Sequence, residues 1–269
     1  MNKHARITSL QNPRVKNAVK LRRRSHRDET GVLLIEGYRE LKRAVDNGHI
    51  PHELYYCPAM FQGENEPELI EQCRASGTVV FECDSDVFLK MAYRDRPEGL
   101  LAIADQISLK LQDLRFGNNP LLLIAEHIEK PGNLGTILRS ADAAGVDAVI
   151  VCDRCTDINN PNTVRASIGA LFAMPVVDAA SEEAVKWLVE NGIQVVAATP
   201  HSERDYTEAD YTGGTAILVG AEQYGLSDHW MNSADHLVRI PMLGQCDSLN
   251  VAAAATILLY EAVRQRRSS

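Results

Sequence analysis

Short apolar runs alternate with amphipathic stretches along most of the chain. In the second half these runs are apolar at nearly every position, which is typical of parallel strands covered on both faces. We predict strands there at Leu121–Ala125, Ala148–Cys152, Ala173–Val177, Gln194–Ala198, Ala216–Val219 and Leu237–Ile240. Helices are predicted at Asn133–Ala143, Asn162–Leu171, Glu182–Asn191 and Leu249–Arg266. The second half is therefore expected to be an α/β unit with a parallel sheet and helices on both faces.

The first half shows the same alternation at shorter spacing. Strands are predicted at Val32–Ile35, Glu53–Cys57, Thr78–Cys83 and Leu100–Asp105, and helices at Arg14–Arg24, Tyr38–Asn47, Pro67–Ser76 and Asp86–Tyr93. This pattern indicates a small α/β sandwich. A polar stretch ending in Gly-Asn-Asn-Pro follows it. We therefore expect a first domain at 1–106, a linker at 107–119 and a second domain at 120–269.

Composition places the chain among ordinary globular proteins, because 45% of its 269 residues are hydrophobic and 24% are charged. No apolar run approaches the roughly 20 residues that a membrane span needs, and the start lacks the apolar core of a secretory signal. We expect a cytoplasmic protein with no membrane partner. The alternative is an organelle transit peptide, since the first residues are rich in arginine and free of acids.

The six cysteines are scattered, and only Cys152 and Cys155 form a C-x-x-C pair. A zinc site needs further ligands, and no second pair or histidine cluster lies nearby in the sequence. We therefore predict free thiols and no metal, with a redox or metal role for this pair as the alternative.

Basic residues are concentrated at the start of the chain. The net charge is -8, yet Met1 to Arg27 holds nine Lys or Arg residues and no acid. This split predicts that the N-terminal region holds a polyanion, by way of Lys16, Lys20, Arg22, Arg23 and Arg24. The alternative is a solvated terminus without a partner.

The common nucleotide-binding motifs are absent. The sequence contains no G-x-x-x-x-G-K-[ST], no G-x-G-x-x-G after a strand and no G-x-S-x-G. Three polar loops with glycines remain, at Glu126–Gly135, Gly220–Ser227 and Ile240–Asn250. Each follows a predicted strand, where ligand sites are common in α/β proteins. Each one alone could equally be an ordinary turn.

Asn133 is placed to cap the helix that carries Arg139, and Ser248 is placed to cap the last helix. The alternative for the second loop is an ordinary turn followed by a helix capped by Ser227. The last helix begins with the small residues Ala252–Ala255, which allow another backbone to come close. We expect the three loops to converge on one pocket.

Together these loops resemble the three motifs of the SpoU-type, TrmH-like RNA ribose 2′-O-methyltransferases of the SPOUT superfamily. The matching stretches are Asn133–Arg139, Leu218–Ser227, Ile240–Gly244 with Ser248–Val251, and the intervening Asn162–Pro175. They occur in family order and spacing, and the resemblance covers Leu121 to Arg264. Glu126, Ala221 and Ala252 depart from the residues most frequent in the family, and Ala221 leaves one polar contact in doubt.

The resemblance implies a fold and partners that the residues alone do not disclose. The second domain would contain a deep trefoil knot, bind S-adenosylmethionine in it, and form a homodimer through the knot helices. The first domain resembles a small RNA-binding domain akin to a ribosomal protein, on the basis of Ile7–Arg14 and Leu33–Arg39. Arg165, in the family-like intervening stretch, joins the expected RNA contacts.

Site residues also follow from the resemblance. Cofactor contacts are expected from Val219, Gly220, Ile240, Met242, Leu249 and Asn250. Arg139 is the expected catalytic residue, supported by Asn133, Glu222, Ser248 and Asn250. Whether Arg139 acts as a base or anchors a phosphate stays open, although a guanidinium almost never loses its proton.

The function implied is S-adenosylmethionine-dependent methylation of a ribose 2′-hydroxyl in structured RNA, more in keeping with ribosomal than transfer RNA. The alternatives are a transfer-RNA ribose or base methyltransferase of the same fold, and an inactive RNA-binding protein. The sequence does not identify the RNA or the nucleotide.

Overall fold

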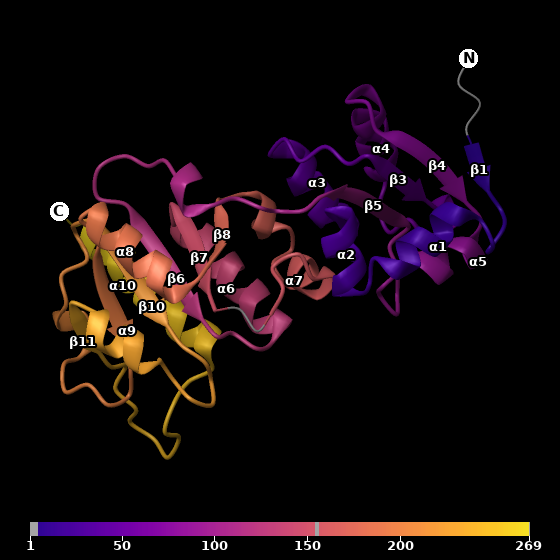
Figure 1. The fold of residues 1–269 in the computed structure, drawn as a ribbon. Helices are drawn as coiled ribbons and strands as arrows, with labels where there is room; N and C mark the ends of the chain where they lie inside the picture. The colour runs from indigo at the N-terminus through magenta and orange to yellow at the C-terminus, as the bar shows by residue number, and fades with distance from the viewer. Residues whose placement is uncertain (1–4, 154–155, 269) are drawn as a thin grey trace. The chain divides into compact units, whose positions relative to one another are not determined.

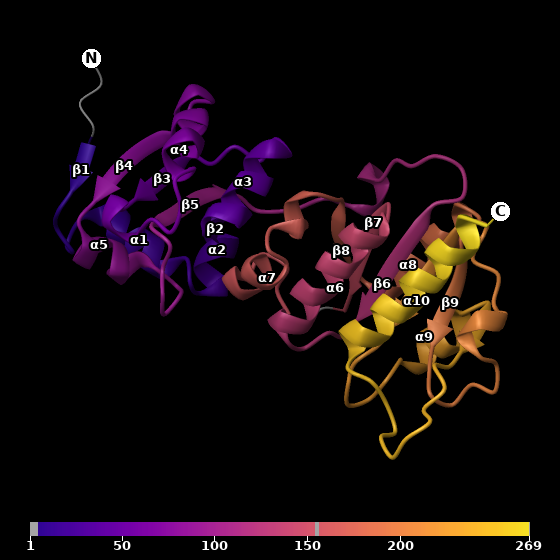
Figure 2. The same ribbon diagram turned by 180° about the vertical axis from the view of Figure 1, so that it is seen from behind.

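The computed structural model describes residues 5–153 and 156–268 and is shown from two sides in Figures 1 and 2. The chain forms two compact units. One contains the residues up to Gln106 together with Asn159–Ala173, and the other contains Ile107–Ile158 and the residues from Met174 on. The segment Asn159–Ala173 thus groups with the first unit, although its sequence lies within the second half. Cys155 lies outside the described residues.

The first unit is built on a mixed five-stranded sheet. Its strands are β1 (Ala5–Ile7), β2 (Val32–Glu36), β3 (Glu53–Tyr56), β4 (Val79–Cys83) and β5 (Leu100–Asp105). Their order is β1-β4-β3-β5-β2, with β5 antiparallel to both of its neighbours. The sequence analysis missed β1, because three residues are too few to show an alternating pattern.

Helices pack on both faces of this sheet. On one face, α1 (Pro13–Lys20) and α5 (Ser85–Met91) contact each other and share an apolar core with Leu34, Tyr55 and Leu101. Adjacent strand residues point to opposite faces. The other face is covered by α3 (Tyr38–Asp46), which contacts β2 and β5, and by α4 (Glu66–Ala75), which contacts β4.

The helix predicted at Arg14–Arg24 is two helices. The first, α1, ends at Lys20, and α2 spans Arg24–Thr30. The guanidinium of the buried Arg27 lies at the break and donates to the carbonyls of Leu21 and Arg22, at 2.9 and 3.0 Å. Carbonyls freed at a helix end need such partners, so Arg27 stabilises the break from inside the fold.

The second unit contains a six-stranded sheet that is parallel throughout. Its strands are β6 (Leu121–Glu126), β7 (Ala148–Cys152), β8 (Val176–Ala179), β9 (Gln194–Ala198), β10 (Thr215–Val219) and β11 (His236–Val238), in the order β11-β9-β10-β6-β7-β8. The predicted parallel α/β unit is therefore confirmed. The central strands β6, β7 and β10 are buried at every position, in line with their unbroken apolar sequence.

Two pairs of helices cover this sheet, as the two views show (Figures 1 and 2). On one face α6 (Pro131–Ala144) packs along α10 (Val251–Arg266). On the other face lie α8 (Ser181–Glu190) and the short α9 (Asp228–Ser233), which was not among the predicted helices. Trp230 of α9 is fully buried, and its indole N–H donates to Ser181 Oγ at 2.7 Å. No helix among the described residues is long and apolar enough to cross a membrane.

The stretch between β7 and β8 differs most from its prediction. The helix expected at Asn162–Leu171 is a shorter α7 (Pro161–Ala166) followed by a 3-10 turn at Ala170–Phe172. Ile168 and Gly169 separate the two with positive φ angles of 51° and 79°. The next strand begins at Val176 rather than Ala173, because Pro175 cannot donate a hydrogen bond to the sheet.

Both predicted helix caps, Asn133 and Ser248, are wrong. Helix α6 begins at Pro131, so Asn133 lies inside its first turn rather than capping it. The last helix is capped by Asn250, whose Oδ1 accepts from the amide of Ala252 at 3.0 Å, and not by Ser248. Ser227 caps α9, as in the alternative interpretation of the second loop. Both errors have one cause. An Asn or Ser near the start of a helix caps it only if it directly precedes the first helical residue and has non-helical backbone angles.

Candidate active site

A cavity of about 510 Å³ lies in the second unit at the carboxyl ends of β9 and β10. This volume is in the range of small-molecule sites. Three segments line it, namely those that follow β9, β10 and β11. Among the expected cofactor contacts, the cavity lining includes Val219, Gly220, Ile240, Met242 and Leu249, together with Glu222 and Ser248. Asn250, Asn133 and Arg139 do not line it.

Glu222 joins the three polar loops at the edge of this cavity. Its Oε1 accepts from Asn133 Nδ2 at 2.5 Å and from Asn250 Nδ2 at 2.8 Å. Its Oε2 accepts from Lys130 Nζ at 3.0 Å. Asn250 Nδ2 also lies 3.3 Å from Asn133 Oδ1. The predicted convergence of the three loops is thus present in the structure, and one carboxylate holds it together.

The loop after β10 is closed by a tight backbone contact. Ala221 and Gly225 exchange two backbone hydrogen bonds of 3.1 and 3.0 Å. A Cβ on Gly220 would lie 2.6 Å from the Gly225 carbonyl oxygen, and Gly225 has a φ angle of +69°. Gly220 is therefore required by the fold of its own loop, and Gly225 supplies a backbone conformation that other residues rarely adopt.

Arg139 stands apart from this cluster. Its side chain is exposed on α6 and forms no hydrogen bond or ion pair with the residues that the structure describes. By contrast, Ser140, the next residue, contacts Thr256 of α10 through a 2.7 Å hydrogen bond. The exposed Arg139 is therefore free of side-chain partners among the described residues, whereas its neighbour Ser140 contacts α10.

Sequence reasoning missed one wall of the cavity. Residues Ala198–His201, at the end of β9 and directly after it, line the cavity together with the other two segments. Thr199 is buried there, and its Oγ1 accepts from the His201 amide at 3.3 Å. The signal was a Thr-Pro pair immediately after an apolar strand, where the polar hydroxyl closes a turn.

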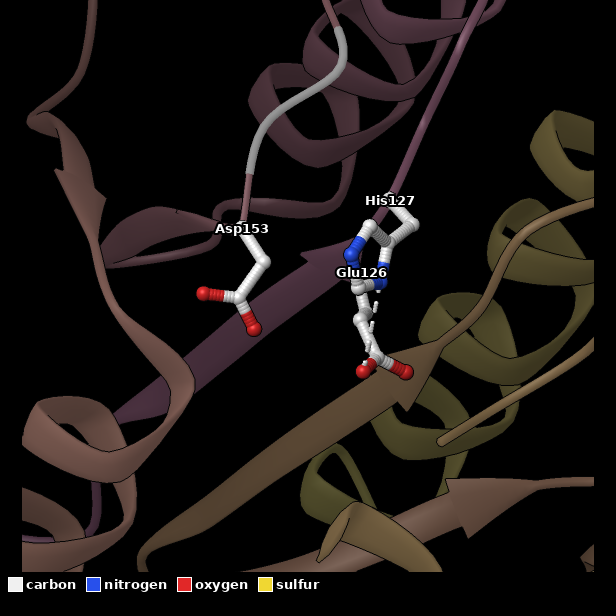
Figure 3. Close-up of side chains that lie close together, drawn as sticks. All are labelled: Glu126, His127 and Asp153. Atoms are coloured by element: carbon white, nitrogen blue, oxygen red, sulfur yellow. Dashed lines mark ion pairs between the residues drawn. The ribbon is translucent and has the colours of Figure 1, made fainter. Parts of the chain in front are cut away.

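A second group of polar side chains lies at the ends of β6 and β7. Glu126, His127 and Asp153 bring potential ligand atoms within 4.8 Å of one another (Figure 3). Glu126 Oε2 accepts from the Ser227 amide at 3.0 Å, and Asp153 accepts from the amide and hydroxyl of Ser181. These carboxylates therefore already hold neighbouring loops in place. The expectation that the protein binds no metal stays a prediction.

Cys152, the described member of the C-x-x-C pair, is fully buried at the end of β7. Burial raises the pKa of its thiol far above the ordinary range. A thiol reacts as the thiolate, so this cysteine is poorly suited to redox exchange or metal binding.

The predicted basic RNA contacts fall into two groups. Lys16, Lys20 and Arg23 are exposed, and their side chains form no hydrogen bond or ion pair in the part of the chain that the structure describes. Arg22 instead donates to the carbonyls of Lys90 and Ala92, at 2.9 and 2.5 Å, and so caps the end of α5. Arg24 pairs with Asp28 at 3.4 Å, and Arg165 lies exposed on α7.

The fold and the cavity define an α/β protein with a ligand site at the carboxyl edge of a parallel sheet. Comparison with known proteins is more specific. Residues 120–260 match the SpoU rRNA Methylase family, and residues 12–102 match the MRM3-like substrate binding domain. The chain belongs to the SpoU rRNA methylase family.

Full-length relatives share both units. The 23S rRNA (uridine(2479)-2′-O)-methyltransferase of Streptomyces viridochromogenes is 33% identical over 91% of this chain and 87% of its own. The crystal structure of an AdoMet-bound rRNA methyltransferase from Sinorhizobium meliloti, 35% identical, matches with a TM-score of 0.88 over 96% of this chain and 97% of that one. The crystal structure of the SpoU methyltransferase AviRb from S. viridochromogenes in complex with AdoMet is 32% identical. It matches with a TM-score of 0.88 over 96% of this chain and 100% of that one.

Proposed function

We propose that this protein transfers a methyl group from S-adenosylmethionine to a ribose 2′-hydroxyl of ribosomal RNA. The observation that carries the proposal is the cluster in which Glu222 binds Asn133 and Asn250, beside a 510 Å³ cavity. Three loops far apart in sequence meet there, in a chain of the SpoU family. The 2′-O-methyltransferases among its relatives support the reaction and the RNA class.

The cavity suits the proposed cofactor. Backbone at Val219 and Gly220 can hydrogen-bond to an adenine edge, while Ile240, Met242 and Leu249 offer apolar surface for its ring. When bound, S-adenosylmethionine supplies an electrophilic methyl group on a sulfonium ion. The residues of the cavity then have to bind and orient this cofactor and exclude water.

Arg139 is the proposed catalytic residue. A ribose hydroxyl is a weak nucleophile, so its placement accounts for much of the rate enhancement. The exposed guanidinium of Arg139 can bind the phosphate next to the target ribose through two parallel hydrogen bonds. We favour this role over that of a base, because a guanidinium keeps its proton. Glu222, Ser248 and Asn250 order the loops against which the nucleotide is placed.

The first unit is proposed to hold the RNA. It matches a substrate-binding domain model, and Lys16, Lys20 and Arg23 present exposed positive charges without partners among the described residues. Phosphate contacts from such residues give affinity without sequence preference. Choice of the target then depends on RNA shape and unpaired bases.

The trefoil knot is part of the same proposal. Strand β11 is at the edge of the sheet, whereas α10 packs against β10 and α6 nearer its centre. Residues 239–250 must therefore cross back over the carboxyl edge, where several of them line the same cavity as the loop after β10. This path supports a threaded connection.

A homodimer through the knot helices completes the proposal. Large apolar side chains near the site and on α10 are exposed, with Leu243 at 98%, Tyr224 at 78% and Tyr260 at 49%. Burial of such surface against a second copy is favourable. Light scattering on the purified protein measures the mass directly, and a monomer would contradict the dimer.

Arg139→Ala tests the assignment of function. We expect the variant to bind S-adenosylmethionine with the wild-type affinity in isothermal titration, because Arg139 does not line the cavity. Transfer of tritiated methyl to 23S rRNA should fall by about 10³-fold or more, the scale set by losing a charged anchor at a reacting group.

Arg115→Ala is the matched control, since Arg115 is also exposed in the second unit but contacts only its own loop. It should retain both binding and transfer. Absence of S-adenosylmethionine binding and of methyl transfer in the wild-type protein would instead favour the inactive RNA-binding alternative.

A further inference from the structure

A second cavity, of about 610 Å³, lies wholly within the first unit. Its walls come from the start of α3, the loop before α4, the segment before β5, and α7 together with Ile168. The lining is mostly polar and charged, and includes Tyr38, Arg39, Arg94 and Arg165. The methyl-transfer chemistry proposed above uses none of this cavity.

The acidic side chains of the cavity are already neutralised or bonded. Arg94, whose side chain is 13% exposed, pairs with Glu40 and with Glu98, each at 2.6 Å. Arg94 also donates to the Glu36 carbonyl at 2.8 Å. In the same wall, Glu66 accepts from the amides of Gln62 and Gly63. Each of the three carboxylates therefore has at least one partner in the cavity wall, whereas Glu66 Oε2 is buried without a hydrogen-bond partner among the described residues.

Two arginines at the cavity remain available. Arg39 and Arg165 are exposed, and the side chain of neither forms a hydrogen bond or ion pair with any residue that the structure describes. They come from opposite halves of the sequence. Arg165 lies within the stretch matched by the SpoU model, and Arg39 within the stretch matched by the substrate-binding model. The lining holds three arginines and three glutamates, so its formal charges balance, and the guanidinium groups of Arg39 and Arg165 are the cations left open to a ligand.

The segment that carries Arg165 is fixed firmly to α3. Arg43 Nη1 donates to the Ile168 carbonyl at 2.7 Å. A Cβ on Gly169 would lie 3.0 Å from Glu40 Cα, so the two backbones are in close contact there. This packing holds Arg165 and Arg39 at one cavity without a flexible hinge between them.

We infer that this cavity binds one unpaired nucleotide of the RNA substrate. Arg39 and Arg165 would bind its phosphates, since guanidinium groups form paired hydrogen bonds with phosphate oxygens. The half-buried Tyr38 offers an aromatic ring for stacking of the base. Proteins read RNA largely through such splayed-out bases. The inference rests on the proposed function, and it adds a second contact that selects bulged or looped RNA.

The test measures binding of hairpin RNAs to the full-length protein by fluorescence anisotropy. One hairpin is fully paired, and four others carry a single bulged A, C, G or U. We expect at least one bulged hairpin to bind about tenfold more tightly than the paired one, the scale of one stacked base. The double variant R39A/R165A should bind all five with equal affinity.

Matched variants separate the cavity from general electrostatics. K90A/R96A removes two exposed charges of the same unit that do not line the cavity, and it should retain the tenfold preference. Tyr38→Leu should lose the preference, whereas Tyr38→Phe, which keeps the ring, should retain it. Loss of affinity for paired and bulged hairpins alike in R39A/R165A would overturn the inference, as would an unchanged preference.

Two further measurements complete the test. Uridine monophosphate should compete with the bulged hairpin more strongly than inorganic phosphate; equal competition would mean that the cavity binds only a free anion. The same preparation is assayed for S-adenosylmethionine binding and methyl transfer. A protein that methylates RNA but shows no bulge preference would refute this inference alone, and one without transfer would refute the proposed function.

Discussion

The side chains that join the loops of the candidate active site form hydrogen bonds with one another. Glu222 accepts from Asn133, Asn250 and Lys130, while Asn250 also caps α10. The sequence identified Asn133, Glu222 and Asn250 as residue types in a family-like pattern. It could not show their mutual contacts, because hydrogen bonds between distant loops depend on how the chain returns to the sheet.

Gly220→Ala should damage the cofactor cavity specifically. The added Cβ would meet the Gly225 carbonyl at 2.6 Å, so the loop that lines the cavity has to open. We expect S-adenosylmethionine affinity to fall by about tenfold or more, equivalent to ~1.4 kcal/mol. Isothermal titration measures this. Gly117→Ala, where a Cβ meets nothing within 4 Å, serves as control and should bind normally.

His49 should make the stability of the first unit depend on pH. Burial beside Phe172, with ring centroids 5.3 Å apart, lowers the pKa of His49 below its ordinary value. The unfolded chain therefore takes up the proton first as pH falls, and the free energy of unfolding decreases below about pH 6.5. Urea unfolding at a series of pH values should show this decrease in the wild type and a smaller one in His49→Leu. An identical pH profile for both proteins would contradict the assignment.

At the scale of elements, the apolar pattern predicted the bounds of several strands, but it did not predict where helices are interrupted. Strands β7, β9 and β5 have the predicted bounds. The division between α1 and α2 depends on the buried Arg27, a residue type that patterns assign to the surface. The turn at Ile168 and Gly169 has positive φ angles, which could not be predicted from a run of residues that are compatible with a helix.

Asn250→Ala should affect both an element and the site. It removes the cap of α10 and the hydrogen bond to Glu222, and we expect a loss of ~1–2 kcal/mol in the free energy of unfolding. S-adenosylmethionine affinity should fall as well, because the neighbouring Leu249 and Ser248 line the cavity. Thermal unfolding and titration measure the two effects.

Asn12→Ala is the matched control, since Asn12 caps α1 in the first unit through the same kind of bond to the Arg14 amide. It should reduce stability and leave cofactor affinity unchanged. Equal loss of affinity in both variants would show that Asn250 acts only through global stability.

For the whole molecule, the net charge of -8 conceals an uneven distribution. The sequence shows that basic residues are concentrated at the start of the chain. It does not show which of these side chains are paired within the fold and which are available to bind RNA. Arg22 is used to cap α5 and Arg24 pairs with Asp28. For Arg22 that distinction depends on a tertiary contact with the end of α5, whereas Arg24 and Asp28 form a local i,i+4 pair within α2.

The triple variant K16A/K20A/R23A should therefore weaken RNA binding in a salt-dependent way. Each lost phosphate contact reduces the slope of log affinity against log salt by about 1, so the slope should fall by about 3. Anisotropy titrations between low and high salt give the slope. Arg22→Ala should instead lower the melting temperature with little change in slope; the reverse pattern would refute this division.

The chain passes from one unit to the other at residues 106, 158 and 173. A fragment beginning at residue 107 would keep every methylase motif and still carry Ala170, Leu171 and Phe172, which are buried in the intact chain against the missing unit's own elements. Those side chains would face water, so such a fragment should aggregate. Exchange of N-terminal halves between relatives would fail for the same reason, unless Asn159–Ala173 were exchanged together with them. The two halves of the chain therefore have to evolve as a matched pair.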